Sequence, residues 1–328
     1  MLQRIRDLSA RVFRRAARPG HFVRGRTVAW SGRLESARWL WPARDYLLYV
    51  PNAYGGWDRR PLVVLLHGCK QTAEEFAALT RIVALADRHG WLVLLPRQSQ
   101  KANALGCWNW FDAATVAGQG EVAIIAAQVK SVQHAYGAHP RRIFVAGLSA
   151  GGALAAALGV RHADMFSGVF VHSGLPCGAA RNVAEAAQAM LQGPATDPVK
   201  IGAEVHARTP RVRLPLLAVH GEADSVVSPV NAYQLVRQYL ALNDMHPREG
   251  PANERPAPDA EAFVPLADGR QMRVAEYLDG RRVTARLIQV PQLGHAWAGG
   301  DPAYAFADAK PPDATALLGE FVEGRLRP

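Results

Sequence analysis

A serine between two glycines is the first feature of this sequence that could do chemistry. The pentapeptide Gly147-Leu148-Ser149-Ala150-Gly151 follows the apolar run Ile143–Ala146, and a helix-forming run leaves it. A strand, a sharp turn and a helix in this order form a nucleophile elbow, which presents the serine hydroxyl at a helix N-terminus. The glycines fit because a Cβ at either flank would collide with neighbouring strands. We therefore predict Ser149 as a nucleophile; the alternative is an ordinary turn with an N-cap serine.

A serine nucleophile needs a general base, and the chain has eleven histidines. His295, in the run Gly294-His295-Ala296-Trp297, follows the final predicted strand and comes after a usable acid, as the chain order Ser, Asp, His requires. His67 precedes the serine and belongs to another feature, and the position of His220 suits packing better. We predict His295 as the base; the alternative is a histidine in a surface loop.

The acid should follow a strand between the serine and the histidine. Asp224 does so, because Leu216–Val219 reads as a strand and residues 220–224 form the turn beyond it. A buried carboxylate there would accept the Nδ1–H of the base, fix its tautomer and stabilise the imidazolium. Glu222 and Asp244 are the rivals to this assignment.

Acyl transfer also needs an oxyanion hole, in which two backbone N–H groups face the carbonyl oxygen of the tetrahedral intermediate. One donor is the residue after the nucleophile, Ala150. The other comes from a loop after an early strand. Because His67-Gly68-Cys69 directly follows the apolar run Pro61–Leu66, we predict the Cys69 amide as the second donor. In this interpretation His67 orders the loop; the alternative is a simple turn.

Alternating strands and helices must position these residues. The predicted strands are Asp45–Val50, Pro61–Leu66, Trp91–Leu95, Ile143–Ala146, Gly168–His172, Leu214–Val219 and Arg286–Val290. The predicted helices are Ala73–His89, Glu121–Tyr136, Ala150–His162, Pro229–Leu240 and Ala314–Glu323. This alternation predicts an α/β fold with one mostly parallel sheet covered on both faces, and its strand-to-helix loops meet at one edge. Asp279-Gly280 predicts a hairpin, and residues 241–267 an excursion from the sheet.

Composition agrees with a soluble globular protein: the chain has 328 residues, of which 49% are hydrophobic and 20% charged. Nine arginines and one acid, Asp7, give residues 1–33 a net charge of +8, which leaves only +2 of the total of +10 for the rest. We therefore expect a basic N-terminal arm over residues 1–33, disordered or helical, and a single catalytic domain over residues 34–328. A nucleic-acid-binding body is disfavoured.

The arm allows several interpretations. It is a solvated lead-in without chemistry, a weakly amphipathic helix at an anionic membrane or storage granule, or a transit-type address. A secretory signal is disfavoured, because Met1 to Gly20 has no apolar core. We expect a cytoplasmic, granule-associated protein; secretion by a route without a recognisable signal peptide is the alternative.

Four runs resemble one family: LLHGCKQ (65–71), GCWNWF (106–111), GLSAGG (147–152) and GHAWAGG (294–300). They are similar to the polyhydroxybutyrate (PHB) depolymerase-type esterases of the α/β-hydrolase fold, over roughly Arg44 to Gly300. By position, the resemblance implies Ser149, Asp224 and His295 as the catalytic residues and Cys69 in the oxyanion loop.

The resemblance also implies an apolar groove for the methyl-bearing backbone of a hydroxyalkanoate chain. Trp108, Trp110 and Phe111 would line it, together with Trp297 beside the histidine; packing in the core is the alternative for each. Cys69 and Cys107 lie within two of the family's motifs, where they form either a bridge or, in a reducing cytoplasm, two thiols.

The expected function is that of a serine esterase that hydrolyses poly- or oligo-(3-hydroxyalkanoate) esters through an acyl-enzyme, without metal or cofactor. The alternatives are a feruloyl or acetyl-xylan type esterase, a general short-chain carboxylesterase, and a catalytically silent scaffold. The chain ends 33 residues after His295, so we expect no polymer-binding module. Amorphous granules, soluble oligomers or short esters are therefore expected substrates rather than crystalline polymer.

Overall fold

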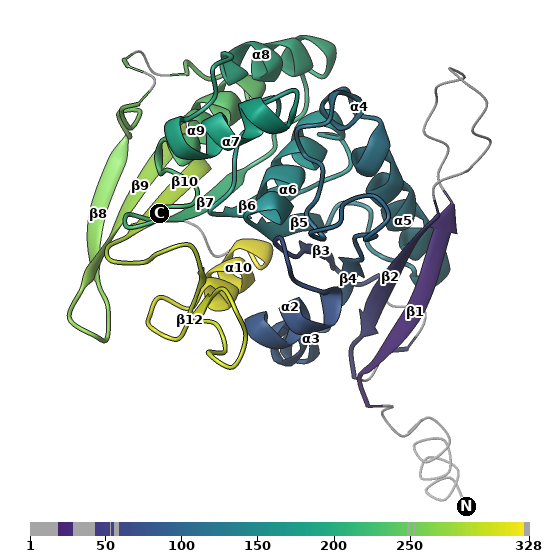
Figure 1. Ribbon diagram of the computed structural model, residues 1–328. Helices are drawn as coiled ribbons and strands as arrows, with labels where there is room; N and C mark the ends of the chain where they lie inside the picture. The colour runs from purple at the N-terminus through teal and green to yellow at the C-terminus, as the bar shows by residue number, and fades with distance from the viewer. Residues whose placement is uncertain are drawn as a thin grey trace, which may run out of the picture.

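The computed structural model describes residues 19–28, 43–52, 54–55, 59–247, 250–251 and 253–324 (Figure 1). Their centre is a ten-stranded sheet. In spatial order its strands are β1 (His21–Val28), β2 (Ala43–Val50), β4 (Leu92–Pro96), β3 (Leu62–Leu66), β5 (Ile143–Leu148), β6 (Gly168–His172), β7 (Leu216–Gly221), β10 (Arg282–Val290), β9 (Gln271–Asp279) and β8 (Ala260–Pro265). The strands from β4 to β10 in this order run parallel, and the outer pairs at both edges run antiparallel.

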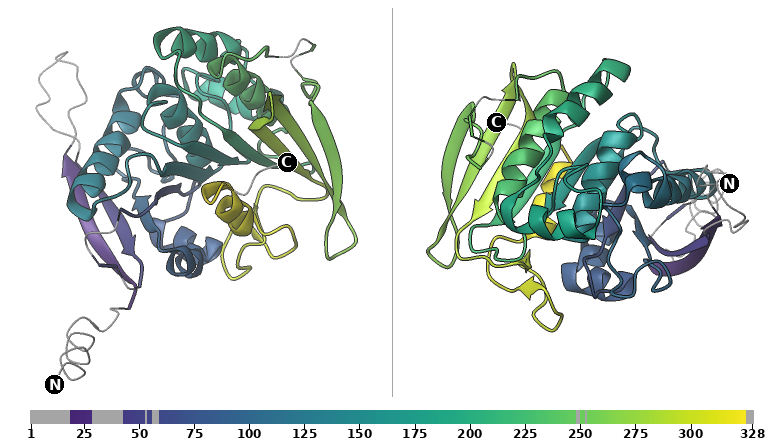
Figure 2. Two further views of the ribbon diagram at one scale, coloured as in Figure 1. Left: turned by 180° about the vertical axis from the view of Figure 1, so that it is seen from behind. Right: turned by 45° about the horizontal axis from the view of Figure 1, so that its top comes forward.

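Helices cover both faces of this sheet. They are α2 (Ala73–Thr80), α3 (Ile82–His89), α4 (Ala113–Val116), α5 (Gly120–Tyr136), α6 (Ala150–Arg161), α7 (Val183–Gln192), α8 (Pro198–Arg208), α9 (Val230–Leu242) and α10 (Ala314–Val322). Figures 1 and 2 show α2, α3 and α10 on one face, and α5, α6 and α9 on the other. The short strands β11 (Trp297–Ala298) and β12 (Ala307–Asp308) form a separate pair.

The central strands are uniformly apolar because the helices bury them from both sides. All five residues of β3 are buried, and they alternate between two hydrophobic clusters, one on each face of the sheet. Burial on both faces removes the polar alternation of a half-exposed strand, which is why the runs PLVVLL and WLVLL predict strands correctly. No helix in the described part of the chain combines the length and the apolar composition that a membrane-spanning segment needs.

The first edge strand corrects the prediction for the N-terminal arm. His21–Val28 pairs with β2 along its whole length, so this part of residues 1–33 is neither helical nor disordered. Its side chains alternate: Val23 is half-buried, whereas Arg24 and Arg26 are exposed. The arginines thus lie on the solvent face of a strand. Their high charge obscured the two-residue alternation of side chains that is typical of a strand. Residues 1–18 and the predicted boundary at residues 33 and 34 lie outside the described part of the chain.

The predicted helix Ala73–His89 is two helices. Thr72 caps α2 with a capping box, as expected, but Arg81 then adopts a left-handed conformation with φ 53° and separates α2 from α3. The Arg81 guanidinium donates a hydrogen bond to the Gly299 carbonyl oxygen. A partner 218 residues away could not be read from local periodicity. Gly90 ends α3 with φ 71°, as predicted.

The last part of the sheet also differs in detail from the prediction. The hairpin at Asp279-Gly280 joins β9 and β10, as expected. However, β10 lies inside the sheet between β7 and β9, so Arg286–Val290 does not close it. The edge is β8, which lies within the predicted excursion; its side chains are mostly exposed, so it carries little hydrophobic signal.

Candidate active site

The nucleophile elbow lies between β5 and α6, where the sequence predicts it. Ser149 has φ 58° and ψ −122°, an unfavourable conformation for a residue with a side chain. Its N–H donates to the His172 carbonyl oxygen at 2.9 Å, and its side chain caps no amide of α6. A Cβ on Gly151 would lie 2.3 Å from the Leu66 carbonyl oxygen, and one on Gly147 would lie 2.4 Å from the Gly151 backbone. Close backbone packing therefore enforces the turn.

Three side chains from distant parts of the chain meet at this elbow. The Ser149 Oγ lies 2.8 Å from His295 Nε2, and His295 Nδ1 lies 2.8 Å from Asp224 Oδ2. Ser149 follows β5, Asp224 follows β7 and His295 follows β10, so all three stand beyond the carboxyl ends of strands in the parallel part of the sheet. Ser149 is 8% exposed and Asp224 5%. The structure thus brings the three predicted residues together; their catalytic role stays a prediction.

Hydrogen bonds hold the Asp224 carboxylate in one orientation. The amides of Val226 and Val227 donate to Oδ1 at 3.0 and 2.9 Å, which leaves Oδ2 for His295. Burial acts to raise the pKa of Asp224, but the hydrogen bond and charge of His295, with help from His220 and the Val227 amide, outweigh it and lower the pKa. The group is therefore a carboxylate at neutral pH, as an acid that orients a base must be.

The two rival acids do not reach the base. Glu222 is exposed, and Asp244 lies 3.4 Å from His206 Nε2. His220, set aside as a base by the sequence, is buried, and its Nε2–H donates to the Val227 carbonyl oxygen at 2.8 Å. Burial lowers the pKa of His220, so it packs as a neutral ring beneath the turn that carries Asp224.

The loop His67–Gln71, named the oxyanion loop here, lies against the elbow. A Cβ on Gly68 would lie 3.6 Å from the Ser149 Cβ. The amides on either side of Cys69 are occupied: the Gly68 N–H donates to Gln71 Oε1 at 2.8 Å, and the Lys70 N–H donates to the Leu105 carbonyl oxygen at 2.9 Å. Ala150 is the first residue of α6, so its N–H has no partner within the helix. The assignment of Cys69 and Ala150 as the two donors stays a prediction.

A disulfide joins Cys69 to Cys107 and so ties the oxyanion loop to the segment that carries the aromatic run. The prediction left this pair open between a bridge and two thiols, and the structure has the bridge. Cys177 is a buried free thiol, and burial raises its pKa to about 11.

The predicted aromatic groove is wrong for its three tryptophans. Trp108 is 1% exposed and Trp110 5%, and both belong to the core; the indole N–H of Trp108 donates to the His67 carbonyl oxygen at 3.0 Å. Trp297 is fully buried on the other face of the sheet, where its ring stacks on His172 at 5.2 Å. Burial of the large apolar surface of an aromatic ring is favourable, so these rings pack into the core beside the site.

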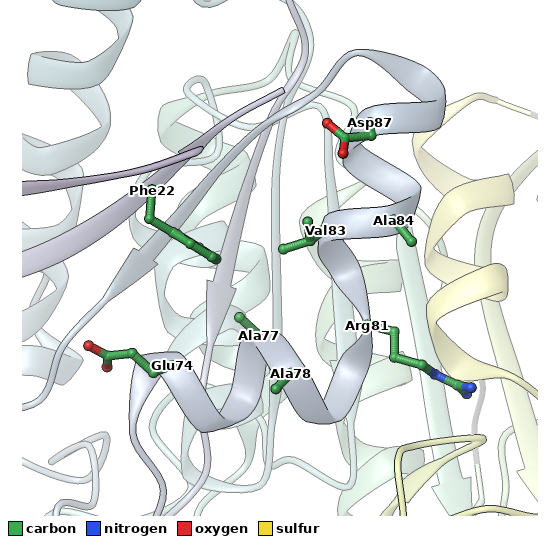
Figure 3. Close-up of a pocket in the computed structure, with 8 residues that line it drawn as sticks. All are labelled: Phe22, Glu74, Ala77, Ala78, Arg81, Val83, Ala84 and Asp87. Atoms are coloured by element: carbon green, nitrogen blue, oxygen red, sulfur yellow. The ribbon is translucent and has the colours of Figure 1, made fainter. Parts of the chain in front are cut away.

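Phe111 is the partly buried member of the aromatic set. It lines a hollow of about 390 Å³ with Arg44, Asn109 and Glu121, and the residues that line this hollow include none of Ser149, Asp224 and His295. A second hollow, of about 560 Å³, lies between β1 and the helices α2 and α3 (Figure 3). Its floor is apolar, built from Ala77, Ala78, Val83 and Ala84, with Phe22 on one side. Neither hollow belongs to the serine site.

Sequence reasoning missed two residues close to the site. Phe306 places its ring edge-on to His295, with 6.4 Å between ring centres. Gln71, inside the quoted run LLHGCKQ, bonds to the oxyanion loop and to the Ala305 carbonyl oxygen. No local pattern in the sequence assigns a role to either residue, because their partners are distant in the chain.

In the part of the chain that the structure describes, no group of three or more His, Cys, Asp or Glu side chains is arranged to hold a metal ion.

Comparison with known proteins identifies a matching family and several similar proteins. A family model described as esterase PHB depolymerase matches residues 44–255, more than half of the chain. Poly(3-hydroxyalkanoate) depolymerase C of Paucimonas lemoignei is 31% identical over 185 residues, which are 55% of this chain and 44% of that protein. Feruloyl esterase B of Neurospora crassa is 27% identical over 206 residues, which are 58% of this chain and 67% of that protein.

A solved structure supports the fold. An acetyl xylan esterase from Aspergillus awamori superposes with a TM-score of 0.62 at 20% identity, over 77% of this chain and 89% of that one. With the mostly parallel sheet and its helices, this likeness confirms the predicted α/β-hydrolase fold. The chain spans less than half the length of the Paucimonas depolymerase.

Proposed function

The chain belongs to the esterase PHB depolymerase family, and from this premise we propose that it is a serine esterase that hydrolyses carboxylic esters. One observation carries the proposal: the hydrogen-bonded line from Asp224 through His295 to Ser149, with 2.8 Å at each step. A hydroxyl bonded to an imidazole, which is itself bonded to a buried carboxylate, is the arrangement that activates serine for attack on a carbonyl.

The reaction proceeds in two halves. Ser149 Oγ attacks the ester carbonyl carbon while His295 Nε2 takes its proton, and the Asp224 carboxylate stabilises the imidazolium. The negative charge on the carbonyl oxygen faces the amides of Cys69 and Ala150. His295 then gives its proton to the leaving alcohol, and an acyl-enzyme remains on Ser149. Water repeats the sequence and releases the acid.

The substrate class that we propose is the ester of a 3-hydroxyalkanoic acid, as polymer or oligomer. It is supported by the family and by the name of the Paucimonas relative. Feruloyl and acetylated xylan esters are the alternative, which the names of other relatives suggest. A general short-chain carboxylesterase is also compatible with the site, because one fold and one triad serve many acyl groups.

Parallel assays of one preparation test this proposal. Clearing of a suspension of amorphous polyhydroxybutyrate is compared with release of ferulate from methyl ferulate and of acetate from acetylated xylan. We expect clearing to dominate, and we expect the Ser149→Ala protein to lose it by at least about 10⁴-fold. Equal hydrolysis by the variant and the parent would reject the serine mechanism; ferulate or acetate release without clearing would reject the polymer substrate.

The proposal extends to location. Residues 1–18 contain six arginines and one aspartate, a composition suited to the anionic surface of a cytoplasmic storage granule or a membrane. Deletion of residues 2–18, with β1 kept, should abolish co-sedimentation with phosphatidylglycerol vesicles and leave hydrolysis of p-nitrophenyl butyrate unchanged. Deletion of all of residues 1–33 is unsuitable, because it removes a strand of the sheet. Unchanged co-sedimentation would reject this role for the arm.

A further inference from the structure

The side-chain amide of Gln71 is used at both ends beside the serine site. Its Oε1 accepts the Gly68 N–H at 2.8 Å, and its Nε2 donates to the Ala305 carbonyl oxygen at 3.1 Å. The residue is only 7% exposed, so neither bond is replaced by water at low cost. A single buried side chain therefore connects the oxyanion loop with a segment more than 230 residues further along the chain.

The first of these bonds lies one peptide away from the predicted oxyanion donor. The peptide unit between Gly68 and Cys69 carries the Gly68 carbonyl and the Cys69 N–H, and because it is planar and trans these two groups point in opposite directions. His67 Nδ1–H donates to the Gly68 carbonyl oxygen at 2.8 Å, and Gln71 holds the Gly68 N–H just before it. With both groups held, the direction of the Cys69 N–H is fixed.

The second bond leads to the side of the site that carries the base. Ala305 precedes Phe306, whose ring stands edge-on to His295, and the Phe306 carbonyl oxygen accepts the Trp297 N–H at 2.8 Å. Other ties of the oxyanion loop lead to the segment 105–108: the Cys107 disulfide, the bond to Leu105 and the bond from the Trp108 indole to His67. Gln71 thus sets the spacing between the oxyanion donor and the segment beside the imidazole.

We infer that Gln71 is a positioning residue. Through Gly68 it holds the Cys69 amide at the oxyanion, and through Ala305 it fixes the position of that amide relative to His295. The inference rests on the proposed esterase function. A misplaced donor weakens stabilisation of the tetrahedral intermediate, whereas binding of the uncharged ester changes little. Loss of Gln71 therefore acts on kcat and leaves KM nearly constant.

Gln238 offers a matched control for a test of this inference. It is also a buried glutamine that accepts a backbone N–H, from Cys177, and donates to backbone carbonyl oxygens, of Cys177 and Pro198. We expect Gln71→Met to lower kcat for p-nitrophenyl butyrate roughly 10- to 100-fold with KM within about twofold. Gln238→Met should lose comparable thermal stability and retain kcat. The inhibition constant of an alkyl trifluoromethyl ketone, which forms an oxyanion on the serine, should rise in Gln71→Met by the same factor as kcat falls.

The pH dependence of kcat/KM in Gln71→Glu gives a second test, because it would not change if Gln71 had only a structural role. A protonated carboxyl can still accept from Gly68 and donate to Ala305, whereas a carboxylate cannot donate. The ratio of kcat/KM in this variant to that of the parent should therefore fall as the pH rises through the pKa of the new carboxyl. Gln238→Glu should show a flat ratio over the same range.

The outcomes separate the inference from the function on which it rests. A parent labelled by a fluorophosphonate at Ser149, with unchanged kcat in Gln71→Met or an equal loss in Gln238→Met, would overturn the inference alone. The inference would also be overturned if the ratio of kcat/KM in Gln71→Glu to that of the parent did not change with pH. A loss of kcat in Gln71→Met without a matching change in the ketone inhibition constant would overturn it as well. A folded parent that is neither labelled nor active would overturn the proposed function, and the inference with it.

Discussion

The nucleophile elbow and the oxyanion loop lie against each other, and each supplies one amide to the proposed oxyanion hole, yet different forces hold them. In the elbow, backbone touches backbone: a Cβ on Gly151 would lie 2.3 Å from the Leu66 carbonyl oxygen, and Ser149 keeps a positive φ. The oxyanion loop is held instead by tethers, meaning single connections to other segments. They include a disulfide to Cys107, the Gln71 amide and a backbone hydrogen bond to Leu105.

This difference predicts two kinds of response to change. Steric contacts between backbone atoms cannot relax without movement of a strand or a helix, so a small change in the elbow should have a large effect. Tethers act in parallel, so the loss of one should weaken the oxyanion loop by a limited amount. Four predictions test this contrast, from the largest expected effect to the smallest.

Gly151→Ala should break the elbow. The added methyl group meets the carbonyl oxygens of Leu66 and His67 at 2.3 and 2.4 Å, so α6 cannot keep its place against β3. We expect no folded protein, or a loss of more than about 4 kcal/mol in the free energy of unfolding, measured by urea titration. Gly319→Ala is the control, because the three atoms nearest to its Cβ, at 3.1 to 3.7 Å, all belong to the flexible side chain of Leu85, and alanine favours a helix. A stable, active Gly151→Ala protein would contradict the steric account.

Asp224→Asn should affect chemistry and leave the fold intact. The turn around Asp224 is held by hydrogen bonds to Oδ1, which an asparagine oxygen can still accept, so it resembles the oxyanion loop in construction. The amide cannot stabilise the imidazolium or fix the tautomer of His295, and we expect kcat to fall roughly 10⁴-fold. Steady-state kinetics with p-nitrophenyl butyrate and a melting curve measure both properties. Activity above a tenth of the parent's would remove Asp224 from the mechanism.

Removal of the Cys69–Cys107 bridge should show the graded response of the tethered loop. The bridge closes a loop across a sequence separation of 38, so its replacement by two serines should cost about 4 kcal/mol of unfolding free energy. Because Gln71 and the Lys70 amide still hold the loop, we expect kcat to fall only about tenfold in the protein that remains folded. A complete loss of activity in folded protein would show that the tethers are not parallel.

The smallest effect concerns His172 beneath the elbow, whose carbonyl oxygen accepts the Ser149 N–H. Burial, with the nearby His220 and His295, lowers the pKa of His172 to about 3, whereas the unfolded chain titrates near pH 6.5. Between these values the unfolded state binds more protons, so stability is lost as the pH falls below about 6.5. This group alone should cost about 2 kcal/mol at pH 5.

Urea unfolding at pH 7.5 and pH 5 measures this loss. His172→Gln should lower stability at both pH values, since the Ala298 N–H loses its imidazole acceptor, but should reduce the difference between them by about 2 kcal/mol. An unchanged difference would mean that His172 does not titrate on unfolding in this range.

The parts of the fold that local pattern could predict are those with local causes. The β5 strand, the elbow and α6 follow from an apolar run, two glycines and an alanine-rich segment. The same kind of pattern failed at Arg81 and at β1. The left-handed turn of Arg81 accompanies a bond to Gly299 in a distant loop, and the pairing of β1 depends on β2. In both cases the deciding partner lies outside any local window.

The aromatic residues show the same limit within the site. The resemblance to the family implied a groove lined by Trp108, and Trp297 was added to it because it lies two positions after His295. In the fold Trp108 turns into the core and bonds to the His67 carbonyl oxygen, and Trp297 packs on the far face of the sheet. Phe306, eleven positions after His295, is the ring that faces the imidazole. Nearness along the chain therefore did not predict which aromatic faces the site.

The sequence by itself determined the nucleophile elbow, the order of serine, acid and base, and the loop after an early strand, because each is written in a few neighbouring residues. Only the tertiary structure decided that Asp224 rather than Glu222 bonds to His295, that Cys69 pairs with Cys107, and that Gln71 spans from Gly68 to Ala305. The physical reason is that a hydrogen bond or a disulfide depends on ångström-scale distance and direction. Those are set when separate strands stack into one sheet, and no local pattern of residue types encodes them.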